Sequence, residues 1–135
     1  MGTRSLTFIK DEYDKNNNII CMYRQYDGYL SGHGKELAEF LQDFTVVNGY
    51  SNITPARSAN GMSCLAAQLV AYFKDGIGNI YLYPTNTSDV GEEFIYTISL
   101  IDNQLNIDVK DWNDKIIFSG TPTKLIERIN TKEYA

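Results

Sequence analysis

Residues 61–73 read GMSCLAAQLVAYF and carry the most regular apolar pattern in the chain. The apolar side chains recur at intervals of three and four residues, in the order Met62, Leu65, Ala66, Leu69, Val70 and Phe73. This spacing puts them on one side of a helix, so it predicts an amphipathic α-helix that packs its apolar face against a core. Gly76 and Gly78 follow closely and are expected to end the helix.

Two further helices are expected, one on either side of this one along the chain. After Gly34 a helical spacing recurs in Leu37, Ala38, Leu41 and Phe44. Near the C-terminus, Thr121 and Pro122 form a cap followed by a proline at the first helical position, which predicts a short helix. Its apolar residues are Leu125, Ile126 and Ile129.

Strand patterns fill most of the remaining chain. Residues 4–9 alternate between apolar and polar, residues 18–26 are rich in branched and aromatic side chains, and turn residues at 14–17 join the two runs as a β-hairpin. Further strands are expected at 79–83, 94–100, 105–109 and 115–118, the last three as an antiparallel meander. The prediction is a single α+β domain over residues 1–135, with an N-terminal hairpin, two amphipathic helices, a largely antiparallel sheet and a short C-terminal helix.

The composition narrows the range of partners. A chain of 135 residues with 43% hydrophobic residues can bury a core of its own, and its net charge of −5 disfavours binding to long nucleic acids. No apolar run approaches the length needed to cross a bilayer, so no membrane partner is expected. Cys21 and Cys64 lie within apolar runs and are interpreted as buried thiols of a cytosolic protein rather than as a disulfide.

The inventory of reactive side chains argues against catalysis. One histidine and two cysteines at apolar positions cannot supply the usual nitrogen and sulfur ligands of a zinc site. No nucleophile elbow, phosphate-binding loop or dinucleotide fingerprint occurs, and the acidic residues lie mostly in turns. We therefore expect no catalytic residue, metal or cofactor, and we interpret the chain as a binder of a small anionic ligand.

The segment YRQYDGYLSGHG, residues 23–34, is the first candidate binding site. Arg24 stands between two tyrosines, and three glycines, among them Gly32, lead the chain into a helix start. An arginine and a helix N-terminus both suit a phosphate, while Tyr26 offers a flat face for a base. His33 is the last polar side chain of the block. In the alternative interpretation the glycines shape a tight turn, the tyrosines pack, and His33 caps the helix.

The segment RSANG, residues 57–61, is the second candidate. Arg57 could pair with a phosphate at the start of the long helix, and Asn60 could read a base edge. For Asn60 the favoured interpretation is a helix cap through its side-chain oxygen. Arg128 in the last helix is a third arginine for the ligand, although a surface pair or water would also account for it.

Three blocks of this sequence resemble the type I Thoeris anti-defence proteins of phages and prophages. They are TRSLTF at residues 3–8, the block at residues 23–34, and NGMSCLAA at residues 60–67. The resemblance spans residues 3–85 and so leaves Arg128 outside. Those proteins are sponges, which bind the cyclic ADP-ribose isomers made by bacterial defence enzymes and sequester them without degradation, so that immune signalling is blocked.

The resemblance implies further properties of this chain. It implies capture of a cyclic ADP-ribose isomer, with cyclic oligonucleotides as further ligands, by a homo-oligomer in the cytoplasm of an infected or lysogenic bacterial host. Arginines and helix N-termini would hold the pyrophosphate, and aromatic rings would stack on the base. Two alternatives from other classes stay open: a phosphodiesterase-like enzyme that cleaves cyclic nucleotides, and a structural phage protein whose tyrosine-rich surface serves assembly.

Overall fold

The computed structural model describes residues 2–131, and it confirms the α+β class. The helical elements are η1, a π-helical turn (Leu30–Gly34), α1 (Lys35–Leu41), α2 (Gly61–Phe73) and α3 (Pro122–Thr131). The strands are β1 (Ser5–Lys10), β2 (Asn18–Arg24), β3 (Thr45–Val47), β4 (Ser58–Asn60), β5 (Ile80–Tyr83), β6 (Phe94–Ile101), β7 (Gln104–Asp111) and β8 (Ile116–Gly120). None of the helices in this part of the chain is both long and apolar enough to cross a membrane.

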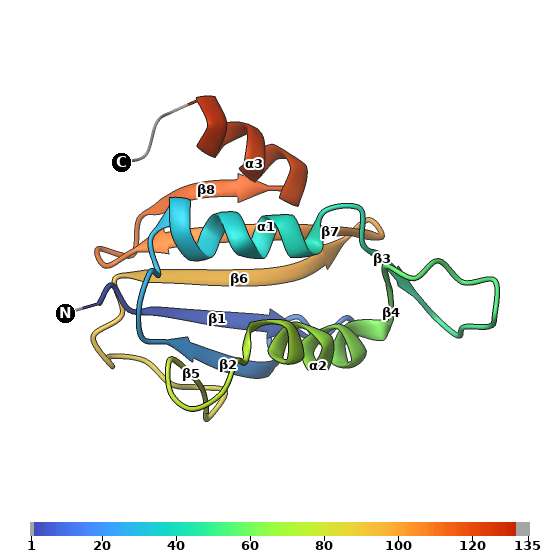
Figure 1. Ribbon diagram of the computed structural model, residues 1–135, viewed down its shortest axis with the longest axis horizontal. Coiled ribbons are helices and arrows are strands. Elements are labelled where there is room, and N and C mark those ends of the chain that lie inside the picture. Colours follow the sequence, from blue (N-terminus) through green and yellow to red (C-terminus); the bar gives the residue numbers. More distant parts are fainter. Residues whose placement is uncertain (1, 132–135) are drawn as a thin grey trace.

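Six strands form one sheet in the order β5-β2-β1-β6-β7-β8 (Figure 1). The N-terminal hairpin β1–β2 and the meander β6–β7–β8 are antiparallel, as predicted from their local patterns. The two units join at the centre of the sheet, where β1 pairs with β6 in parallel. This pairing joins segments far apart in the sequence, and no local pattern predicts it.

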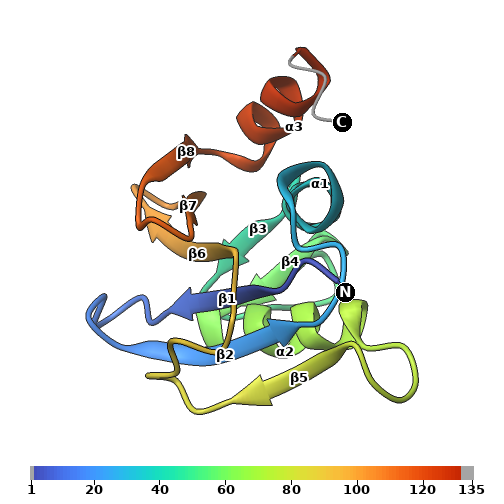
Figure 2. The same ribbon diagram turned by 90° about the vertical axis from the view of Figure 1, so that its left-hand side faces the viewer.

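All three helices pack on the same face of the sheet (Figures 1 and 2). Their buried side chains share one core cluster with the strand residues that face them, among which are Met22 of β2, Tyr96 and Ile98 of β6, and Ile107 of β7. Helix α2 buries Met62, Leu65, Ala66 and Leu69, which confirms the apolar face read from residues 61–73. The core therefore lies between the helices and the sheet.

The opposite face of the sheet carries a smaller cluster. Leu6 of β1 packs there with Cys21 and Tyr23, so the alternation in β1 turns Ser5 and Thr7 toward the helices. Both of these polar side chains are completely buried. Cys21 and Cys64 are both free; Cys21 is buried as predicted, whereas Cys64 is only partly buried. Burial together with the charge of Glu92 raises the pKa of the Cys21 thiol to about 11.

The segment between α1 and α2 departs from the prediction. Helix α1 ends at Leu41, and Phe44 lies outside it because Asp43 takes a left-handed backbone with φ 62° and turns the chain. β3 and β4 then pair in parallel as a separate two-stranded sheet, and the loop between them projects from the body of the molecule (Figure 1). These short strands carry no periodic signal of their own, so sequence patterns did not reveal them.

Candidate functional site

Arg24 and His33, both predicted site residues, meet inside the core. Arg24 ends β2 on the helix-facing side, and its Nη1 donates to the Nδ1 atom of His33 at 3.1 Å and to Glu36 at 2.5 Å. An arginine has only donors, so Nδ1 of His33 must be the accepting nitrogen. The ring proton therefore sits on Nε2, which donates to the Thr7 hydroxyl at 2.8 Å.

His33 is neutral in this setting. The side chain is completely buried, and burial together with the charge of Arg24 lowers the pKa of the imidazole to about 3. Its two nitrogens are both engaged, which replaces the interpretation of His33 as a helix cap. A neutral, fully enclosed imidazole is poorly suited to move protons for a substrate at neutral pH.

The glycine-rich block folds into a turn in which its backbone N–H groups donate to carbonyls of the same segment. The N–H of Gly32 bonds to Tyr29, and the N–H of His33 bonds to the carbonyl of Asp27 at 2.7 Å. A Cβ atom at Gly32 would lie 2.5 Å from that same carbonyl, so glycine is needed for the chain to approach itself. The ring of Tyr26 is half exposed, but its backbone N–H is taken by Asn79.

Arg57 lies at the end of a helix rather than at the start of one. Its guanidinium donates to the carbonyls of Glu39 and Phe40 in the last turn of α1 and to that of Gln42, the residue that follows the helix. It also lies 5.6 Å from the centre of the Phe44 ring. The structure thus places Arg57 and Arg24 at opposite ends of α1, each bound to protein groups.

Asn60 occupies the cap position of α2, but its side chain does not cap the helix. Its Oδ1 accepts from the N–H of Gly49 at 2.7 Å, which fastens the β3–β4 loop. The helix is capped instead by Glu12 of the β1–β2 hairpin, whose Oε2 accepts from the N–H of Met62 at 2.9 Å. The favoured prediction for Asn60 was wrong because a distant carboxylate supplies the cap.

Arg128 lies apart from the other predicted site residues. It projects from α3 toward β8 and donates to the carbonyl of Ile117 at 3.3 Å. Its Nε is buried without a hydrogen-bond partner among residues 2–131. The contact with the sheet accounts for its place in the fold.

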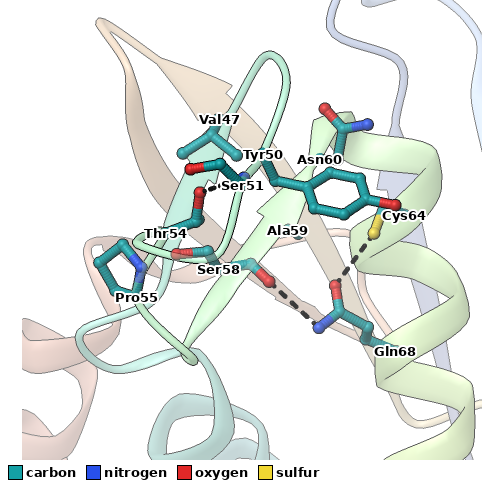
Figure 3. A pocket seen from close by; sticks show the side chains of 10 residues that line it. All are labelled: Val47, Tyr50, Ser51, Thr54, Pro55, Ser58, Ala59, Asn60, Cys64 and Gln68. Atoms are coloured by element: carbon teal, nitrogen blue, oxygen red, sulfur yellow. Dashed lines mark hydrogen bonds between the residues drawn. The ribbon is translucent and has the colours of Figure 1, made fainter.

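A cleft lies between the β3–β4 loop and the outer side of α2 (Figure 3). It has a volume of about 450 Å³. Its lining residues come from the loop, from β4 and from α2: Val47, Tyr50, Ser51, Thr54, Pro55, Ser58, Ala59, Asn60, Cys64 and Gln68. Of the side chains given a binding role from the sequence, Asn60 lines this cleft, and Ser58 and Ala59 of the same RSANG segment line it too.

The cleft combines one flat ring with fixed polar groups. Tyr50 is 76% exposed, and in Figure 3 its ring extends from the loop toward Cys64. The amide of Gln68 is held at both ends, since it donates to the carbonyl of Ser58 at 3.2 Å and accepts from the Cys64 thiol at 3.2 Å. The hydroxyl of Ser58 is buried without a partner in the described structure. A flat ligand rich in hydrogen-bonding groups fits this chemistry.

Sequence patterns did not predict four of the lining residues: Tyr50, Ser51, Thr54 and Gln68. The available signal was the run NGYSNITP at residues 48–55, which breaks all periodicity and carries turn residues beside an aromatic one. Such loops, held on a rigid scaffold, often carry binding residues. Within residues 2–131 no group of three or more histidine, cysteine, aspartate or glutamate residues is placed to hold a metal ion. Comparisons with protein-family models, with curated proteins and with solved structures found no match to this chain.

Proposed function

We propose that this protein binds a cyclic ADP-ribose isomer in the Tyr50 cleft and sequesters it without degrading it. The observation that carries the proposal is the cleft itself, which has about 450 Å³ for a ligand and an exposed aromatic ring facing fixed amides and hydroxyls. That volume lies within the range of small-molecule sites. The sequence resemblance to the type I Thoeris anti-defence proteins supports the choice of ligand class.

The cleft offers a partner for each part of such a ligand. Tyr50 provides the face on which the adenine stacks. Asn60 and Gln68 lie where amides can pair with base edges or ribose hydroxyls. The pyrophosphate points toward the N-terminus of α2, which begins beside Asn60 and favours negative charge.

Binding without cleavage is the sponge mechanism, and the fate of the ligand tests it. The enclosure of His33, the chain's single histidine, supports a role without acid-base chemistry. Protein incubated with the cyclic ADP-ribose isomer and then denatured should return the intact compound. Recovery of a linear nucleotide would overturn the proposal in favour of the cyclic-nucleotide hydrolase. Self-association and a place in the cytoplasm of a bacterial host stay predictions.

Removing the ring of Tyr50 should weaken binding strongly. A base stacked on an aromatic side chain contributes roughly 1 to 3 kcal/mol, so Tyr50→Ala should raise the Kd by about 5-fold to 150-fold in titration calorimetry. The melting temperature of the free protein should hardly change, because Tyr50 is largely exposed. Tyr26→Ala is the matched control from the glycine-rich turn. Weaker binding in Tyr26→Ala with unchanged binding in Tyr50→Ala would move the site to that turn.

Glu12 should compete with the ligand. Its carboxylate occupies the N–H of Met62, and the hollow beside it, of about 250 Å³, shares Val47 and Asn60 with the cleft. Glu12→Gln should therefore tighten binding several-fold, while the loss of a carboxylate at a helix N-terminus lowers the stability of the free protein by about 0.3 to 1 kcal/mol.

Asp14→Asn, an equal charge change in the same exposed hairpin, separates this effect from a general change in potential. Calorimetry and thermal melting of both variants give the two readouts. Weaker binding in Glu12→Gln than in Asp14→Asn would mean that Glu12 holds the ligand rather than competing with it.

A further inference from the structure

A second hollow, separate from the Tyr50 cleft, lies at the other end of α2. It has a volume of about 280 Å³ and is lined by Arg24, Glu36, Tyr72, Phe73, Asn79 and Ile80, none of which lines the cleft. At about 30 Å³ per water molecule the hollow has room for about nine waters, or for one small organic molecule. An inference about this hollow does not depend on the function proposed for the cleft.

Arg24 and Glu36 bring opposite charges together in this hollow, and part of the Arg24 guanidinium makes no hydrogen bond. The Arg24 side chain is only 9% exposed, and its Nη1 serves both Glu36 and His33. Its Nε is buried and has no partner among residues 2–131, and Nη2 lies 4.0 Å from the nearer carboxylate oxygen of Asp27. Nη2 makes no hydrogen bond to residues 2–131, so this edge of the guanidinium keeps a donor for an oxygen ligand in the hollow.

The balance of charge decides the class of ligand. A simple anion at Arg24 would face two carboxylates, Glu36 and Asp27. A simple cation at Glu36 would lie beside Arg24. A zwitterion avoids both penalties, because its carboxylate takes the free edge of Arg24 while its ammonium takes Glu36, and every charge keeps a partner.

We propose that this hollow binds a small zwitterion of the α-amino-acid type. Tyr72 is 55% exposed and lies next to Phe73, so aromatic surface adjoins the charged pair. The two rings lie 5.1 Å apart, edge to face. A ligand with an apolar or aromatic side chain would place it on this surface while its charged end reaches Arg24 and Glu36.

A panel of the twenty common amino acids, screened by thermal shift and measured by calorimetry, tests the proposal. Saturable binding is expected for members with apolar side chains. For L-leucine the matched analogues are 4-methylpentanoate, which lacks the ammonium, and 3-methylbutylamine, which lacks the carboxylate. Both analogues should bind at least about tenfold more weakly, since each leaves a charge of the pair unmatched. Absence of saturable binding by any amino acid up to about 10 mM overturns the proposal.

A pair of variants on one helix locates the site. Glu36→Gln keeps an oxygen for Arg24 but loses the charge that attracts the ammonium, so amino-acid affinity should fall about tenfold. Glu39→Gln makes the same change on the exposed side of α1 and should leave affinity unchanged. If 4-methylpentanoate binds as tightly as L-leucine, and tighter still in Glu36→Gln, the hollow is an anion site and the zwitterion is excluded.

Discussion

The free energy of unfolding is expected to fall as the pH drops from 6.5 toward 3, because the unfolded chain protonates His33 and the folded protein does not. Burial and the neighbouring charge of Arg24 lower the pKa of His33 from 6.5 to about 3. Between these two values the unfolded state binds one more proton than the folded state. Stability therefore decreases by up to about 1.4 kcal/mol per pH unit on acidification. Above pH 6.5 both states carry a neutral ring, so the contribution is fully present and constant.

His33→Gln isolates this effect from the titration of the carboxylates. Glutamine keeps a donor for Thr7 and an acceptor for Arg24 without a titratable group. Urea unfolding of both proteins at several pH values between 7 and 4 should show a steeper loss of stability in the parent protein. Parallel curves would mean that the imidazole takes up its proton inside the fold. An imidazole NMR signal that titrates near pH 6.5 in the folded protein would contradict the prediction directly.

Local patterns predicted the elements of this fold, but not the way in which they meet. The period of residues 61–73 and the turn at residues 14–17 report neighbours a few positions away, and the structure confirms α2 and the β1–β2 hairpin. The parallel pairing of β1 with β6 depends on contacts across most of the chain. The same pairing brings Tyr96 opposite Thr7, in the layer of side chains that encloses His33.

The arginines show why site prediction was harder than fold prediction. Arg24 and His33 are nine positions apart in one segment, so a single site was predicted for both, and the structure brings their side chains into contact. Nothing local to Arg57 shows that α1 ends beside it, so its bonds to the carbonyls of Phe40 and Gln42 could not be foreseen. Tyr50 was missed because its place opposite α2 is set by the β3–β4 pairing and by the Asn60 contact to Gly49.

Replacement of Arg24 by leucine should destabilise the protein by about 3 kcal/mol. Loss of Arg24 leaves the buried Nδ1 atom of His33 without a hydrogen bond, and about 3 kcal/mol is the upper end of the cost of such an unsatisfied group. The loss also breaks the ion pair with Glu36, and about 3 kcal/mol is the lower end of the cost of breaking a buried pair. Glu36 moderates the loss because its side chain is 46% exposed and water can solvate it. Arg24→Lys should recover part of the stability, since lysine keeps the charge but lacks the planar fork.

Arg57→Ala is the control variant for the stability loss expected in Arg24→Leu. Arg57 donates to backbone carbonyls, but it is exposed, so its loss should cost about 1 kcal/mol in the same urea titration. Equal losses for the two variants would show that the buried network around His33 contributes no more than a surface cap. A loss of stability in Arg24→Leu would also weaken the apparent binding of a ligand, because an unfolded fraction does not bind. Weaker binding in this variant therefore reports a contact with the ligand only if the variant is fully folded at the assay temperature. Glu36→Gln probes the same hollow while leaving the bond between Arg24 and His33 in place, so it separates the two effects.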